Sequence, residues 1–188
     1  RIFMFYKSTR NSNIKVSSAE AITQGISVEG GLFVPESIPS ISLDEITSLA
    51  DKSYADRAAF VFSKFLTDFT DVEIHYCTDN AYNTKNFESE SITEISHLFD
   101  GTYMLELWHG PTCAFKDMAL SILPHLLTTA AKKNNNEGEI VILTATAGDT
   151  GKAALAGFAD VPGTRIIVFY PKNGVSRIQE KQMVTQKG

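Results

Sequence analysis

The sequence predicts an α/β protein, in which a mainly helical α+β region over residues 1–90 precedes the start of a parallel sheet over residues 91–188. Two observations support this prediction. In the first region, segments with the apolar spacing of amphipathic helices follow N-capping signals. In the second region, apolar strand-like runs alternate with helical patterns, which is typical of a sheet built from β-α-β units.

The first region is expected to begin with a strand and to continue mainly as helices. Ser42 with Glu45, and Thr70 with Glu73, have the spacing of a capping box, in which a hydroxyl and a carboxylate each bond a backbone amide at a helix N-terminus. In order, the expected elements are a strand at 3–6, a helix at 19–24 that Ser17 or Ser18 caps and Gly25 ends, an edge strand at 32–34, and helices at 43–50, 54–66 and 71–82.

A polar segment at residues 83–91 is expected to separate two domains, 1–90 and 91–188, because Phe87 is its only apolar side chain. Pro124 removes a backbone donor from the first long helix after this boundary, so we expect a kink or two shorter helices there. The runs at 140–143 and 166–169 are continuously apolar, so these two strands are expected to be central, with both faces covered. The expected elements are strands at 103–107, 139–145 and 165–170, and helices at 117–133, 150–159 and 177–186, the last of which Ser176 and Gln179 are expected to cap.

The composition argues against several classes of protein. The 188 residues are 43% hydrophobic and 21% charged, and a net charge of -5 without a Lys/Arg cluster argues against nucleic-acid or anionic-membrane partners. No apolar run could span a bilayer or serve as a secretory signal, so we expect a cytoplasmic protein. The two cysteines are expected to be free thiols, and the four histidines lack metal-ligand spacing, so we expect no metal site.

Lys116 lies where the strand at 103–107 gives way to the helix at 117–133. The positive end of a helix macrodipole disfavours an ammonium there, and the flanking Ala114 and Phe115 can exclude water from it. Both effects favour the neutral amine, which is the form that attacks a carbonyl to make a Schiff base. The alternative is a lysine whose charge reaches solvent.

A second chemical site is predicted at residues 144–151, which join a buried strand to a helix. Gly148 and Gly151 allow the backbone to approach a ligand closely. The free amides and the dipole at the start of the helix favour an anion. The alternative is a tight strand-to-helix turn without a ligand.

Gly151 and Lys152 resemble the end of a nucleotide-binding P-loop, but the rest of that motif is missing. Thr146 stands where the motif needs glycine, and Ala153 stands where it needs Ser or Thr. The glycine pattern of a dinucleotide-binding site is also missing. The sequence therefore excludes a nucleotide-binding loop at this position.

Residues 109–117, His-Gly-Pro-Thr-Cys-Ala-Phe-Lys-Asp, closely resemble the pyridoxal-phosphate lysine motif of threonine synthases. Cys113 stands where that family usually has leucine, an apolar exchange that leaves Lys116 intact. Residues 144–154 resemble the Thr-Ser-Gly-Asp-Thr-Gly loop of the same family, with Ala147 in place of the usual serine. Two further matches, at Ser8–Arg10 and Gly30–Pro35, extend the resemblance over nearly the whole chain.

The resemblance implies a type II fold like that of the tryptophan synthase β subunit, with a three-layer pyridoxal-phosphate domain after an N-terminal domain. Lys116 would hold pyridoxal 5'-phosphate covalently and serve as acid and base, and Asp149 would lie near the phenolic oxygen of the cofactor. His109 would lie near the substrate phosphate or fix the turn, while Asp117 would cap the helix. The implied cofactor-binding residues are Lys116, Phe115 and Asp149; the implied substrate-binding residues are His109, Thr146, Gly148, Thr150 and Gly151, the last three as donors to the substrate carboxylate.

The activity that the resemblance implies is conversion of O-phospho-L-homoserine and water into L-threonine and phosphate. One alternative is a phospho-lyase of the same fold that releases a 2-oxo acid, since Ala147 removes a hydroxyl from the second site. Another is a non-catalytic interaction protein, because fold does not fix function. Family members are far longer than 188 residues, so we expect an N-terminal fragment that by itself binds the cofactor poorly and is inactive.

Overall fold

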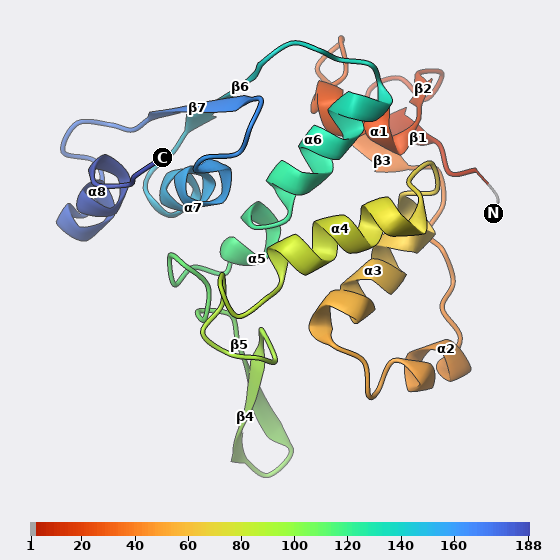
Figure 1. The fold of residues 1–188 in the computed structure, drawn as a ribbon, viewed down its shortest axis with the longest axis horizontal. Helices are drawn as coiled ribbons and strands as arrows, with labels where there is room; N and C mark the ends of the chain where they lie inside the picture. The colour runs from red at the N-terminus through yellow and green to blue at the C-terminus, as the bar shows by residue number, and fades with distance from the viewer. Residues whose placement is uncertain (1–2) are drawn as a thin grey trace. The chain divides into compact units, whose positions relative to one another are not determined.

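A computed structural model describes residues 3–188 of the chain (Figure 1). The chain divides into two compact units, of which the first comprises residues up to Asn80 together with 125–137, and the second comprises 81–124 together with 138–188. The domain boundary expected at residue 90 stays a prediction. Within the described range, no helix combines the length and the apolarity that are needed to cross a bilayer.

The first unit contains a small antiparallel sheet, in which β1 (Tyr6–Ser8) lies between β2 (Lys15–Val16) and β3 (Phe33–Pro35). Tyr6 pairs with Val16 on one side and with Pro35 on the other, so the central strand begins at Tyr6 and not at the predicted residue 3. β3 is an edge strand, as predicted. Proline has no backbone N–H to donate to a neighbouring strand. Pro35 is tolerated in β3 because an edge strand has a neighbour on one side only.

The helices of the first unit are α1 Ser18–Gln24, α2 Leu43–Ser48, α3 Tyr54–Phe65, α4 Asp71–Ala81 and α6 Leu123–Lys133, of which the part from His125 onward belongs to this unit. Three of them, α1, α2 and α4, begin at capping signals that the sequence predicts. Ser42 and Glu45 form the predicted capping box of α2. Thr70 and Glu73 exchange the same two hydrogen bonds, of 2.7 and 3.2 Å, at the start of α4.

The core of the first unit draws its buried side chains mainly from α3, α4 and α6. The thiol of Cys77 in α4 lies 3.6 Å from the hydroxyl of Thr129 in α6, so these two buried polar groups satisfy each other. Lys133 pairs with Glu73 at 3.0 Å between the same two helices. Other buried side chains of this core include Ala55, Ala59, Phe69, Ile74, Leu126, Leu127 and Ala130.

The second unit contains a hairpin that the sequence analysis did not predict. β4 (Glu94–Phe99) pairs antiparallel with β5 (Thr102–Glu106), so the strand expected at 103–107 is not part of the parallel sheet and that prediction was wrong. The turn contains Asp100 and Gly101, and Gly101 has a φ of +67°, which glycine adopts without steric cost. An Asp-Gly pair between apolar runs is a strong hairpin signal, and it could have identified the missing strand.

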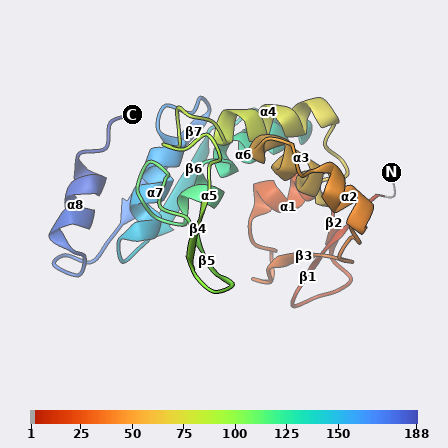
Figure 2. The same ribbon diagram turned by 90° about the horizontal axis from the view of Figure 1, so that it is seen from below.

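Two parallel strands, β6 (Ile140–Ala145) and β7 (Thr164–Phe169), are joined through α7 (Asp149–Phe158), which confirms the predicted β-α-β unit. Figure 2 shows α7 beside both strands, and α7 contacts each of them. The side chains that alternate to the other face are exposed, namely Val141, Leu143, Ile167 and Phe169. The prediction that both faces are covered was therefore wrong for this chain, because only every second side chain of each strand points toward α7.

The segment after Lys116 forms two short helices, as the position of Pro124 predicts. α5 covers Asp117–Leu120 and α6 starts at Leu123, with a break at residues 121 and 122. Pro124 has no N–H with which to bond the carbonyl of Leu120, so one continuous helix would leave that carbonyl without its partner. The last helix, α8 (Arg177–Val184), begins with the predicted capping box of Ser176 and Gln179.

Candidate functional site

The loop that carries Lys116 is folded by the buried carboxylate of Asp117. Asp117 is 1% exposed, and its two oxygens accept hydrogen bonds from the Thr112 amide at 2.8 Å and the Thr112 hydroxyl at 2.6 Å. The amide of Ala114 also points at this carboxylate, at 3.4 Å. Asp117 therefore has a structural role, but it binds the turn before its helix and does not cap the helix as predicted.

Lys116 occupies the N-cap position of α5 and is half-buried. Its Nζ lies 4.9 Å from the centroid of the exposed Phe115 ring, a distance typical of a cation–π contact. In the part of the chain that the structure describes, this Nζ makes no hydrogen bond or ion pair. Because α5 is only four residues long, its dipole acts on Lys116 less than the predicted longer helix would.

The second predicted site is a turn that requires glycine, in which the Thr146 hydroxyl binds two backbone amides. Gly148 has a φ of +140°, a backbone angle that residues other than glycine rarely adopt. The hydroxyl of Thr146 accepts hydrogen bonds from the amides of Gly148 and Gly151, both at 3.0 Å. These two predicted ligand donors are therefore already engaged, and the first amides of α7, those of Asp149 and Thr150, have no acceptor among residues 3–188.

Asp149 is held from two sides at the start of α7. Its Oδ1 accepts a hydrogen bond from Gln179 Nε2 at 2.8 Å and lies 3.4 Å from Lys152 Nζ. The hydrogen bond from Gln179 and, after it, the charge of Lys152 hold the pKa of the Asp149 carboxyl below its usual range. The charge of Lys116 acts in the same direction, so Lys116 and Asp149 lie within electrostatic reach of each other.

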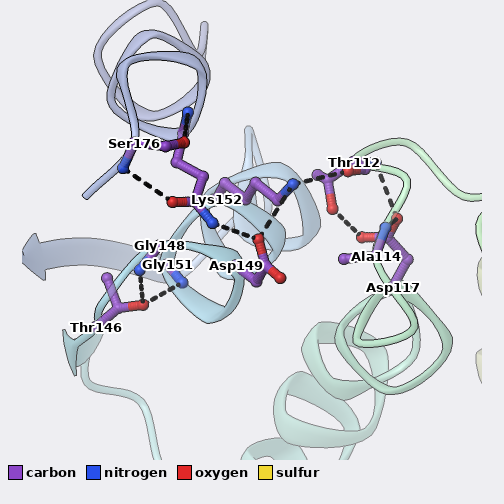
Figure 3. A network of polar contacts seen from close by, with 10 residues as sticks. Thr112, Ala114, Asp117, Thr146, Gly148, Asp149, Gly151, Lys152 and Ser176 are labelled. Carbon is purple, nitrogen blue, oxygen red and sulfur yellow. Dashed lines mark hydrogen bonds and ion pairs between the residues drawn. The ribbon is translucent and has the colours of Figure 1, made fainter.

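Lys152 connects the two predicted sites (Figure 3). Its Nζ donates a hydrogen bond of 3.0 Å to the backbone carbonyl of Thr112, which belongs to the loop that carries Lys116. The same Nζ lies beside Asp149 at the start of α7. The structure therefore brings the two motifs, which lie about 30 residues apart in sequence, into one polar network.

His109 lies at the end of the hairpin and is bound by a neighbouring carboxylate. Its Nε2 lies 2.7 Å from Glu106 Oε2, and the two side chains are 17% and 16% exposed. Ser96, from the opposite strand, also donates to Glu106. This hydrogen bond and, after it, the bond to His109 hold the pKa of Glu106 below its usual range. The carbonyl of His109 accepts from the amide of Glu88 at 3.0 Å, so His109 also fixes the turn.

Three residues that hold predicted site residues in place, Lys152, Gln179 and Glu106, are not among the site residues predicted from the sequence. The sequence indicates Gln179 only as a capping residue. Lys152 follows Asp149 by three positions, a spacing at which helical side chains meet, and this signal could have found it. No group of three or more His, Cys, Asp or Glu side chains in residues 3–188 is arranged to hold a metal ion.

Comparison with known proteins identifies similar sequences along the whole chain. Residues 5–82 match a family model described as the threonine synthase N terminus. A threonine synthase from Schizosaccharomyces pombe is 36% identical over 188 residues, which cover 96% of this chain and 36% of that protein. A threonine synthase-like 1 protein from Pongo abelii is 35% identical over 174 residues, covering 88% of this chain and 23% of that protein.

A solved structure has the same fold as this chain. The crystal structure of PLP-bound threonine synthase from Brucella melitensis superposes with a TM-score of 0.87 at 30% identity, over 96% of this chain and 38% of that one. The chain thus spans well under half the length of the proteins that it matches. Taken with the geometry of the loops around Lys116 and Asp149, these findings show that the chain is similar, over nearly its whole length, to the N-terminal part of threonine synthases.

Proposed function

We propose that the complete protein is a cytoplasmic threonine synthase, which converts O-phospho-L-homoserine and water into L-threonine and phosphate with pyridoxal phosphate as cofactor. The observation that carries this proposal is the arrangement of Lys116, whose amine makes no hydrogen bond among residues 3–188 and whose loop is tied through Lys152 to Asp149 at the start of α7. The similarity to a PLP-bound threonine synthase supports it. The 188 residues alone, which span 36% of the S. pombe protein, are expected to be inactive.

The residues of the site have the chemistry that pyridoxal phosphate requires. Lys116 offers a primary amine that no hydrogen bond engages in residues 3–188, for a bond to the cofactor aldehyde, with the Phe115 ring beside it. Asp149, fixed by Gln179 and Lys152, is an ionised group whose position does not depend on a ligand. When bound, the cofactor supplies an electron sink for charge that develops at the substrate α-carbon.

The protein residues would bind the substrate and move protons. The amides of Asp149 and Thr150, at the positive end of α7, would bind the substrate carboxylate. The amides of Gly148 and Gly151 would join this site only if they left the Thr146 hydroxyl, to which both donate at 3.0 Å. Lys116, once its amine is free, would carry protons at the reacting carbons, because a neutral amine of suitable basicity is an effective general base.

His109 would contact the substrate phosphate, with its ring held in place by Glu106. A histidine bonded to a carboxylate keeps a fixed ring orientation, and the contact at 2.7 Å provides that here. A role at the substrate phosphate would require the imidazole to donate from Nδ1, since Nε2 is engaged with Glu106.

The experiment is a product assay with the complete gene product, pyridoxal phosphate and O-phosphohomoserine, in which phosphate and the carbon product are both measured. We expect threonine and phosphate in equal amounts. Lys116→Ala should lower turnover by a factor of at least about 1,000, since it removes both the covalent link and the acid-base group. Lys172→Ala, at an exposed lysine, is the matched control and should leave turnover unchanged.

Two results would contradict the proposal. Phosphate released together with 2-oxobutyrate would identify a phospho-lyase, and the exposed Ala147 would then be the first position to restore to serine. No phosphate release by a protein that folds would leave a family member without this chemistry.

A further inference from the structure

We propose that Lys152 is a positioning residue, whose buried ammonium ties the loop of Lys116 to the start of α7 and fixes the carboxylate of Asp149. The tie between the two loops follows from this chain alone. Its effect on the cofactor rests on the function proposed above.

The burial of Lys152 requires that its charge be paired. The residue is 9% exposed, and an ammonium without partners at such a position would cost several kcal/mol. Two oxygens meet it, the Thr112 carbonyl at 3.0 Å and Asp149 Oδ1 at 3.4 Å. These oxygens lie on two different segments, so the ammonium is stabilised only while the segments stay together.

Both acceptors are themselves held in place. Thr112 is anchored by two hydrogen bonds to the buried carboxylate of Asp117, the residue next to Lys116. Asp149 also accepts from Gln179, whose side-chain oxygen caps α8 by accepting from the Ser176 amide at 3.1 Å. The ammonium therefore lies in the middle of a series of polar contacts that runs from α8 through α7 to the lysine loop (Figure 3).

Lys152 is unsuited to the other roles that a lysine in this loop could have. Its amine is already engaged with two oxygens and is buried, so it cannot serve as the covalent cofactor lysine without breaking the contact with Thr112. Lys116 is half-buried and has no hydrogen bond at its Nζ among the described residues. The two lysines thus have different roles: the amine of Lys116 is available to a ligand, and the ammonium of Lys152 holds the two loops together.

The first test measures the loops in the cofactor-free complete gene product by amide hydrogen exchange. Lys152→Met keeps an unbranched side chain that is only one atom shorter, but removes the donor and the charge. We expect exchange about tenfold faster or more in residues 110–117 and 146–151, as the loss of a charged hydrogen bond predicts, with α3 unchanged. Lys172→Met is the matched control. Wild-type exchange in both segments of a folded Lys152→Met protein would overturn the proposal.

A measurement on the wild-type protein tests the same point without a variant. Acylation of surface amines, followed by mass spectrometry, should label Lys152 at least about tenfold more slowly than the exposed Lys172, because its amine is buried and hydrogen-bonded. Equal labelling rates for the two lysines would show that the ammonium is not held, and would overturn the proposal even if Lys152→Met did not fold.

The second test uses the cofactor-bound protein and separates positioning from simple structural support. We expect Lys152→Met to lower kcat by about tenfold or more with a smaller change in KM, and to move the pH dependence of the cofactor absorbance to higher pH, because Asp149 loses a neighbouring cation. Lys152→Arg should recover part of both effects. Unchanged kcat and unchanged pH dependence would overturn the role at the cofactor.

The two tests also distinguish this proposal from the proposed function. If the wild-type protein bound no pyridoxal phosphate, the proposed function would fail, while the exchange and labelling experiments would still decide whether Lys152 ties the loops. If the wild-type protein were an active threonine synthase and the Lys152 variants behaved as wild type, only the present proposal would fail.

Discussion

At the scale of single residues, the site depends on side chains that bind backbone groups. The hydroxyl of Thr146 takes the place that an anion would occupy by binding the amides of Gly148 and Gly151. Both glycines are buried, so their amides cannot turn to water instead. When no ligand is bound, the hydrogen bonds of these two amides therefore depend on the Thr146 hydroxyl alone.

Thr146→Val tests this role, because it keeps the shape of the side chain and removes the acceptor. We expect a loss of about 1–3 kcal/mol in the free energy of unfolding, the usual result of leaving buried amides unpaired. Urea unfolding followed by circular dichroism measures this loss. Thr185→Val is the control, since that hydroxyl is exposed and bonds a carbonyl of its own helix. Equal stability of the two variants would contradict the role of Thr146.

At the scale of elements, the lysine loop is supported by close packing of α5 against α7. Gly157 of α7 faces the carbonyl of Leu120 at the end of α5, and a Cβ at Gly157 would lie 2.2 Å from that oxygen. A contact this close is possible only without a side chain. The missing side chain of Gly157 therefore allows the close approach of α5 and α7, the helices that carry Lys116 and Lys152.

The change in unfolding free energy caused by Gly157→Ala has opposite signs for the two effects, close packing and helix propensity. Inside a free helix, replacing glycine with alanine stabilises by about 1 kcal/mol. Here the added methyl must push α5 and α7 apart, and overpacking typically costs about 1–3 kcal/mol. We therefore expect a lower midpoint of urea unfolding. A higher midpoint would mean that the two helices do not approach as closely as described.

α2 is a helix without a buried face, and its stability depends on its ends. It has no buried residue, and its contacts are the capping box of Ser42 and Glu45 and an ion pair between Glu45 and Lys64. Ser42→Ala should cost this helix about 1 kcal/mol and speed hydrogen exchange at residues 43–48 by roughly fivefold. Ser48→Ala, in the last turn, serves as the control. Exchange that stays slow after loss of the cap would contradict this reading.

At the scale of the whole molecule, stability should depend on pH through His125. Burial lowers the pKa of His125 from its ordinary value of 6.5, and its ring packs edge-on against Tyr76 at 6.0 Å. The folded state therefore holds the neutral imidazole, while the unfolded chain takes up a proton below pH 6.5. The contribution of His125 is complete above that pH and is lost as the pH falls from 6.5 toward the lowered pKa.

Urea unfolding as a function of pH measures this effect. The free energy of unfolding should decline as the pH is lowered from 7 to 5, and His125→Phe should flatten that decline because it cannot take up a proton. His97→Gln, at an exposed histidine, should leave the slope as it is. The same slope in the His125→Phe variant would show that another group causes the loss of stability at acid pH.

Much of the fold followed from local chemistry that a sequence displays. The capping boxes at Ser42 and Ser176, and the helix break at Pro124, were predicted because each depends on residues a few positions apart. The tie between Lys152 and Thr112 joins residues 40 positions apart, and no local pattern encodes it. The antiparallel hairpin was missed because the strand at 103–107 was assigned by its apolar run, and its partner is mostly exposed.

Trapping of the cofactor lysine is the most direct test of the central claim, that Lys116 carries pyridoxal phosphate. The complete gene product is incubated with pyridoxal phosphate, reduced with borohydride, digested and mapped by mass spectrometry. We predict one modified lysine, at Lys116, and no modification of Lys152, whose amine is buried against Thr112. A modified Lys152, or a folded protein that carries no cofactor after reduction, would contradict the claim.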